Sequence, residues 1–169
     1  ATFASAAVAN NIAVTVTGYT ISGAQAGNYS LAQPTGLTAN ITQKTLTITG
    51  VTASNKIYDG NTTATLTGTA VLNGIVGSDA VTLGGTPVAT FASAAVANNI
   101  AVTVTGYTIS GAQAGNYSLT QPEGLTADIS AKPLTIIGIN TDTKIYDGNT
   151  IGIISGTPVL VGVVGSDAV

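Results

Sequence analysis

The chain has 169 residues, of which 7% are charged, and it contains no Arg, His, Cys, Met or Trp. Four lysines and seven acidic residues give a net charge of -3, which excludes the basic surface that nucleic acid binding needs. Without Cys there is no disulfide or zinc–thiolate site, and no apolar run approaches the about 20 residues of a membrane-spanning helix.

Short stretches of alternating apolar and polar residues predict β-strands along much of the chain. Turn residues separate these stretches, and the Ala-rich segment Phe91–Ala97 is too short for a stable helix, so it is expected to be a loop. The sequence therefore predicts an all-β fold. In chain order the predicted strands are Leu46–Gly50, Thr62–Gly68, Val81–Leu83, Pro87–Ala92, Ile100–Ser110, Tyr117–Gln121 and Leu125–Ser130, and the predicted turns are Asp59-Gly60, Asn73-Gly74, Gly84-Gly85 and Pro122/Gly124.

The clearest strand places Ile100, Val102 and Val104 on one face, with smaller or polar residues between them, as expected of a half-buried strand. The hexapeptide KIYDGN, Lys56–Asn61, is expected to be a β-hairpin. In that hairpin Asp59-Gly60 would take the positive φ angles of a two-residue type I′ turn.

The same hexapeptide returns at Lys144–Asn149, 88 residues later, and it belongs to a repeat that covers most of the chain. Ala1–Leu31 recurs unchanged at Ala89–Leu119, and Gly77–Val81 recurs at Gly165–Val169 without any gap. The simplest interpretation is a segment of a longer tandem array that begins and ends within a repeat.

Many short strands at even spacing predict a sandwich or a barrel. Gln25–Tyr29, which recurs at Gln113–Tyr117, has the spacing of the tyrosine corner of immunoglobulin-like domains, with Gln in place of the Asp. We therefore expect tandem immunoglobulin-like β-sandwich repeats of 88 residues, with β-grasp-like units as the alternative. The six Tyr and two Phe are assigned to the cores of these units.

The sequence resembles the YDG-type repeats found in tandem in large bacterial surface and secreted adhesin-like proteins. The resemblance rests on KIYDGNTTATLTGTAVLNG, followed by VTLGG, ATFAS, VTVTGYTISGAQAGNYSL, QPTGLTANIT and a closing K-x-L-T, and it extends over nearly the whole chain. It implies a unit beginning near Lys44 or Lys132. Residues 1–43 would then be the C-terminal part of one repeat, 44–131 a complete repeat, and 132–169 the N-terminal part of the next.

The resemblance also implies an extracellular, non-catalytic module at the bacterial cell surface, and it supplies no ligand and no catalytic residue. The residues themselves agree, because the seven acidic residues stand singly and mostly beside Gly or Ser, as turn residues do. We assign no catalytic, cofactor-binding or metal-binding residue and expect no cofactor.

Calcium binding, an isopeptide crosslink and enzymatic catalysis are the three alternatives to this assignment. Calcium could use Asp59 and Asn61, but a calcium site needs six to eight oxygens. A Lys–Asn isopeptide crosslink would need Lys44 or Lys56 buried beside an Asn and a carboxylate, whereas exposed lysines are expected. An enzyme would need two carboxylates within about 10 Å in a cleft.

The predicted function is structural: a tandem array in an extracellular fibre or adhesin stalk, which assembles with itself by exchanging strands between units or chains. The low charge favours this, because uncharged polar surfaces do not repel a neighbouring copy. The alternative is a binding module whose loop Ser110–Asn116 recognises a carbohydrate or another cell surface.

Overall fold

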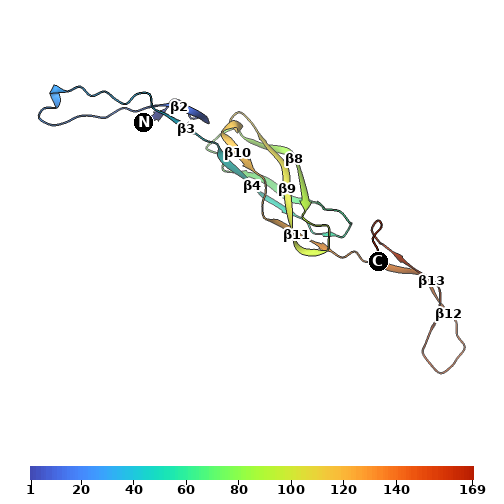
Figure 1. Cartoon of the computed structure of the whole chain (residues 1–169). Helices are drawn as coiled ribbons and strands as arrows, with labels where there is room; N and C mark the ends of the chain where they lie inside the picture. Colours follow the sequence, from blue (N-terminus) through green and yellow to red (C-terminus); the bar gives the residue numbers. More distant parts are fainter. The chain divides into compact units, whose positions relative to one another are not determined.

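The computed structural model describes all 169 residues, and it is built from β-strands with two short 3-10 helices (Figure 1). The predicted all-β fold is confirmed. No helix in the structure is both long and apolar enough to cross a membrane. The elements are β1 (Thr2–Phe3), β2 (Ala9–Thr15), η1 (Ala26–Asn28), β3 (Thr38–Ile41), β4 (Lys44–Ala53), β5 (Lys56–Ile57), β6 (Thr63–Ala64), β7 (Leu66–Asn73), β8 (Thr82–Phe91), β9 (Ala97–Ser110), η2 (Ala114–Asn116), β10 (Tyr117–Thr120), β11 (Leu125–Ser130), β12 (Thr135–Asp142) and β13 (Ile153–Val161).

The chain forms two compact units, each assembled from three stretches of sequence. The strands form four sheets, with the orders β1-β2-β3, β10-β4-β7, β5-β11-β9-β8-β6 and β12-β13. The first unit consists of Ala1–Gly50, Thr69–Pro87 and Gly106–Gln121, and the second of Val51–Gly68, Val88–Thr105 and Pro122–Val169.

The first unit has its core where β10 lies beside β4. The two strands are parallel, and Tyr117 pairs with Lys44 while Leu119 pairs with Leu46. Leu46 and Tyr117 are both buried. The unit also contains the antiparallel pairs β1-β2 and β2-β3.

The second unit has its core around β9 and β11, which are antiparallel. Ile100, Val102 and Val104 of β9 are buried and the residues between them are exposed, so the face predicted from the sequence is confirmed. Ile129 of β11 and Phe91 of β8 complete this core. The hairpin of β12 and β13 also belongs to this unit (Figure 1).

The predicted turn at Gly84-Gly85 is wrong, because both residues lie inside β8. Gly85 has a positive φ of 95°, and a Cβ atom there would collide with the carbonyl oxygen of Gly106 on β9. The glycine therefore permits a close approach of two strand backbones, which a sequence pattern cannot distinguish from a turn. The two strands predicted on either side of it, Val81–Leu83 and Pro87–Ala92, form one strand.

Other expectations about local structure also fail. The predicted strand Thr62–Gly68 is divided between β6 and β7. The Tyr117 hydroxyl makes no tyrosine-corner bond a few residues upstream, because it donates its proton to Asp79, 38 residues away, and accepts from the backbone N–H of Val76, 41 residues away. The assignment of all aromatic residues to the cores is also wrong, since four of them have exposed side chains. These four are Phe3, Tyr19, Tyr29 and Tyr146.

Candidate functional site

The loop Lys56–Asn61, which we call the YDG loop, is closed by its own lysine. Lys56 Nζ donates to Asp59 Oδ1 at 2.7 Å, to the Asn61 carbonyl oxygen at 2.7 Å and to Asn61 Oδ1 at 3.1 Å. Asp59 Oδ1 also accepts from the Asn61 N–H, and Asn61 Oδ1 accepts from the N–H of Thr63. One ammonium group and two short side chains therefore fix the conformation of the whole loop.

The predicted hairpin at this loop is consequently wrong. β5 pairs in parallel with β11 and not with the residues after the loop, while β6 pairs with β8. Gly60 has a positive φ of 80°, but Asp59 is not among the non-glycine residues with positive φ, so no type I′ turn forms. The hydrogen bonds of the lysine replace the cross-strand bonds that a hairpin would provide.

The electrostatics of the loop follow from the same contacts. The hydrogen bond from Lys56 is the main cause of a lowered pKa at Asp59, and the hydrogen bond from the Asn61 N–H lowers it further. Asp59 is therefore a carboxylate at neutral pH. Lys56 Nζ also lies 5.5 Å from the centroid of the Phe91 ring, within the range of a cation–π contact.

This arrangement bears on the calcium hypothesis. Three of the oxygens that could ligate a cation here, Asp59 Oδ1 and the carbonyl and side-chain oxygens of Asn61, accept hydrogen bonds from the ammonium of Lys56. The protein thus supplies its own cation at the position that calcium would need. The acidic side chains of the chain also form no group of three that could hold a metal.

The surroundings of Lys56 resemble those that an isopeptide crosslink requires more than the sequence suggested. The side chain of Lys56 is 17% exposed and contacts both an Asn and a carboxylate, so the expectation of an exposed lysine is wrong for this residue. Amide formation would require a proton donor to the departing amide nitrogen. Asp59, ionised and partly exposed, is poorly suited to that role.

The second YDG loop, Lys144–Asn149, has the same closure. Lys144 Nζ donates to Asp147 Oδ1 at 2.8 Å, to the Asn149 carbonyl oxygen at 2.8 Å and to Asn149 Oδ1 at 2.9 Å. The hydrogen bond from Lys144 lowers the pKa of Asp147. Because Ile145 and Tyr146 of this loop are exposed while the closure persists, the closure depends on local residues alone.

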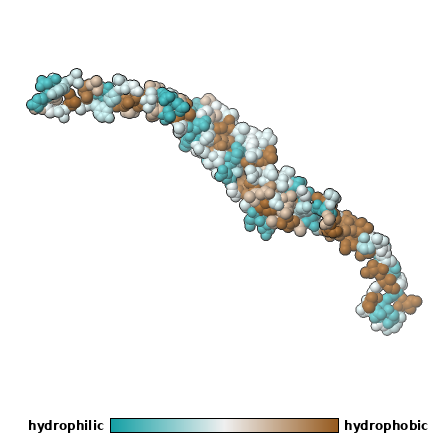
Figure 2. All heavy atoms as spheres, in the orientation of Figure 1, coloured by the Kyte–Doolittle hydropathy of each residue, from teal (hydrophilic) through white to brown (hydrophobic).

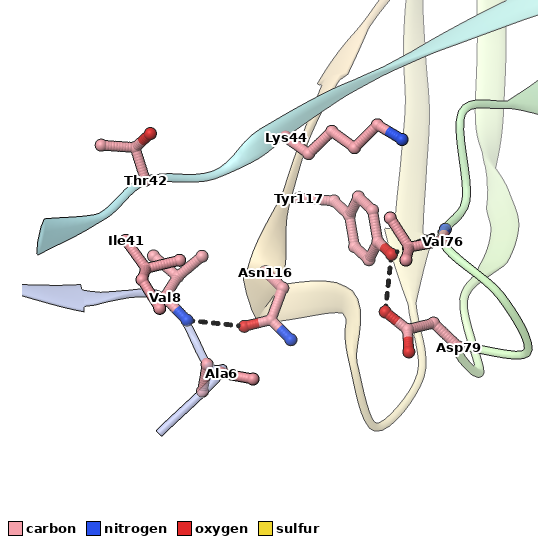
Figure 3. Close-up of a pocket in the computed structure, with 10 residues that line it drawn as sticks. Ala6, Val8, Ile41, Thr42, Lys44, Val76, Asp79, Asn116 and Tyr117 are labelled. Carbon is pink, nitrogen blue, oxygen red and sulfur yellow. Dashed lines mark hydrogen bonds between the residues drawn. The ribbon is translucent and has the colours of Figure 1, made fainter. Parts of the chain in front are cut away.

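A hollow of about 360 Å³ lies in the first unit beside Tyr117 (Figure 3). The Tyr117 hydroxyl donates to Asp79 Oδ2 at 2.6 Å and accepts from the Val76 N–H at 3.0 Å. The hydrogen bond to Asp79 raises the pKa of Tyr117, which therefore stays a neutral hydrogen-bond donor. At another wall, Asn116 Oδ1 accepts from the N–H of Val8 at 3.0 Å (Figure 3).

A second hollow, of about 170 Å³, lies in the second unit, and several of its lining residues are those of the first hollow shifted by 88 positions. Val164 and Asp167 correspond to Val76 and Asp79. Here Asp167 Oδ2 accepts from the hydroxyl of Tyr58, the tyrosine of the YDG loop, at 2.8 Å, which raises the pKa of Tyr58. Asp79 and Asp167, which occupy the same position of the repeat, therefore accept hydrogen bonds from tyrosines at two different positions of the repeat.

In both hollows a neutral tyrosine hydroxyl donates a hydrogen bond to an aspartate carboxylate. Neither hollow was predicted from the sequence, whose local pattern indicated turn roles for the aspartates. The roles of Asp79 and Asp167 as tyrosine acceptors were missed, because their partners lie 38 and 109 residues away. The 88-residue repeat was the one signal that could have linked the two positions.

The fold and these contacts define an all-β domain in which polar side chains bind the protein's own backbone and loops. The sequence matches the YDG domain family over residues 1–36 and 42–124. The chain belongs to this family, which confirms the resemblance at the level of the domain. Comparisons with curated proteins and with solved structures give no match.

Proposed function

We propose that the chain is a non-catalytic structural part of a long bacterial extracellular fibre or adhesin stalk, built from tandem β-sandwich repeats of 88 residues. In this proposal 1–43 and 132–169 are parts of repeats and 44–131 is a complete one. Membership of the YDG domain family and the gapless internal repeat, in which Ala1–Leu31 recurs unchanged, support the proposal.

The observation that carries the proposal is that side-chain hydrogen bonds join consecutive repeats at both of their boundaries. Around residue 43, Gln43 Nε2 donates to the Gly115 carbonyl oxygen and Asn116 accepts from Val8, all within the first unit. Around residue 131, Tyr58 donates to Asp167, within the second unit. Direct side-chain hydrogen bonds at both places favour repeats that are held against each other and transmit tension.

The composition suits an extended assembly for a separate reason. Charged residues make up 7% of the chain, and two of the four lysines are engaged in the YDG loops. Neighbouring copies therefore meet little electrostatic repulsion, and their association needs no specific charge pattern.

The proposal is tested by electron microscopy of the native material. It predicts fibres with an axial repeat of about 3 to 4 nm, the diameter of a compact unit of about 88 residues. Free globular particles, or turnover of a substrate that disappears on replacing one aspartate, would overturn it.

The alternative, a carbohydrate-binding or surface-binding module, has less support. The loop Ser110–Asn116 would carry the recognition, yet Gln113 Oε1 accepts from Ala80 N–H and Asn116 Oδ1 accepts from Val8 N–H. These acceptors are already satisfied within the chain. A glycan array probed with the whole chain separates the two proposals, because it should be blank for a purely structural role.

A further inference from the structure

Two pairs of strands that are far apart in the sequence run parallel, and both pairs have the same register. β10 pairs with β4, with Tyr117 opposite Lys44, and β11 pairs with β5, with Ile129 opposite Lys56. In both pairs the two partners are 73 residues apart in the sequence. The first strands of the segment 44–131 therefore each run beside one of its last strands and in the same direction.

Hydrogen bonds extend the short pair of β5 and β11 at both of its ends. One residue after β5, the Tyr58 N–H donates to the Ser130 carbonyl oxygen at 2.9 Å. One residue before β5, Asn55 Oδ1 accepts from the Asp128 N–H at 2.8 Å, and Asn55 Nδ2 donates to Asp128 Oδ2 at 3.4 Å. These two residues are again 73 positions apart, so the Asn55 side chain continues the register of the strands.

The YDG loop fixes the strand on which this pair depends. The Lys56 carbonyl oxygen accepts from the Ser130 hydroxyl at 3.3 Å, while Lys56 Nζ closes the loop by donating to Asp59 and Asn61. The closure therefore holds the backbone on both sides of Ile57 in the conformation that bonds β11.

Little apolar burial accompanies these bonds. Among the residues 55–58 and 128–130, Ile129 alone is buried, and the side chain of Ile57 is exposed. Hydrophilic and hydrophobic residues are interspersed on the visible surface around β11 (Figure 2). Hydrogen bonds therefore provide much of the resistance to a sliding movement of β5 along β11.

The direction of the strands decides how the pair responds to tension. In a parallel pair the beginning of the first strand and the end of the second lie at opposite ends of the pair. Tension on the chain before β5 and after β11 therefore pulls the strands past each other, and all the bonds between them bear the force together. In an antiparallel hairpin the same tension would peel the bonds apart one at a time.

We propose that residues 55–58 and 128–130, which we call the shear clamp, are the element of the second unit that resists tension along the chain. This inference rests on the proposed fibre function, in which tension enters the segment 44–131 at one end and leaves it at the other. It gives the repeated hexapeptide a mechanical role, because the YDG loop holds one strand of the clamp. The parallel pair of β4 and β10 is loaded in the same direction in the first unit.

Single-molecule pulling tests the clamp, because the chain has no cysteine and handles can be attached at introduced ones. The full chain carrying Ser54→Cys and Lys132→Cys is pulled before β5 and after β11, which loads the clamp in shear. The full chain carrying Ile57→Cys and Lys132→Cys is pulled where both strands end, which peels the same bonds apart. The rupture force should be higher by a factor of about two or more in the first chain, because the evenly spaced bonds break together. Complete extension should release about 25 nm in either chain.

Two asparagine substitutions give a matched comparison. Asn55→Ala removes both side-chain bonds to Asp128, and the lifetime of the shear-loaded clamp at constant force should become about fivefold shorter, as expected for the loss of one net hydrogen bond. In the peeled chain Asn55→Ala should not change the force at which the first bonds break, because Asn55 lies at the far end of the clamp. Asn73→Ala removes a hydrogen bond to Thr49 outside the clamp and should change neither quantity.

Equal rupture forces for the two tether positions would overturn the inference, even if an Asn55→Ala chain does not fold. An effect of Asn55→Ala that is the same in both chains, or no larger than that of Asn73→Ala, would also overturn it. These results leave the fibre function standing where native material forms fibres. Native material without fibres overturns the proposed function, whatever the pulled chains show.

Discussion

The ammonium nitrogen of Lys56 lies 2.7 Å from Oδ1 of Asp59, and the corresponding pair of Lys144 and Asp147 has a distance of 2.8 Å. In both places the lysine also bonds the asparagine two residues after the aspartate. The repeated hexapeptide is therefore explained by one local device: a lysine that replaces cross-strand bonds in closing a tight loop. The tyrosine that stands between the lysine and the aspartate in the sequence remains free to contact other parts of the repeat.

Replacing the lysine should open the loop. In Lys56→Met the carbonyl oxygen and side chain of Asn61 lose their donor, and the free energy of unfolding should fall by about 1–2 kcal/mol. Urea denaturation followed by circular dichroism measures the change. Lys132→Met is the matched control, since the structure gives Lys132 no side-chain hydrogen bond. An equal effect of the two substitutions would contradict the role of the closure.

The acid side of the stability profile should depend on Asp59. Its pKa in the folded chain is lowered from 3.8, so its contribution is present above pH 3.8 and is lost as the pH falls through the folded value. The stability difference between the natural chain and Asp59→Asn should therefore shrink on acidification from about pH 5 to about pH 2. A difference that is constant with pH would show that the carboxylate is not held by Lys56.

The alkaline side should depend on Tyr117. Its pKa in the folded chain is raised from 10.0 by the bond to Asp79, so its contribution is fully present below pH 10.0 and is lost as the pH rises through the folded value. Absorbance titration of tyrosinate should show two late-titrating groups in the natural chain, Tyr58 and Tyr117, and only one of them in Tyr117→Phe. Tyr29→Phe should leave both late groups in place.

The close approach of β8 and β9 should depend on glycine. Gly106 has a φ of 93°, and a Cβ atom there would collide with the carbonyl oxygen of Thr86. Gly106→Ala should lower the free energy of unfolding by about 2 kcal/mol or more, through backbone strain and the clash. Gly115→Ala, where no atom lies within 4 Å, should have little effect. Comparable melting temperatures for both variants would contradict this account.

The repeat supplies a matched pair for the core. Leu46 is fully buried on β4, whereas Leu134, its counterpart 88 residues later, is exposed. Leu46→Ala should cost about 2–5 kcal/mol and Leu134→Ala less than about 1 kcal/mol in dilute solution. Thermal unfolding of both variants at low and high protein concentration checks this.

Period-2 patterns were sufficient to predict the class of the fold and several strands. Leu125–Ser130 and the buried face of β9 follow from such patterns because one face of each strand packs on a core. The parallel pairs β10-β4 and β5-β11 could not be predicted, since they join segments 73 residues apart and no local signal specifies them. Long-range pairing of this kind is set by tertiary packing.

The site was predictable to a smaller extent. The repetition of KIYDGN indicated that the loop matters, but its turn chemistry suggested a hairpin, because Asp-Gly is a common hairpin turn. The competing feature was Lys56, whose bonds to Asp59 and Asn61 span three and five residues. The Tyr117–Asp79 and Tyr58–Asp167 pairs depend on the folded topology and have no local signature at all.

The central claim, that consecutive repeats form an ordered structural array, is tested most directly by the length of recombinant chains that contain increasing numbers of the 88-residue repeat. Small-angle scattering and electron microscopy of this series should show rods whose length grows by one constant increment for each added repeat. Compact particles, or beads whose separation varies from molecule to molecule, would contradict the account.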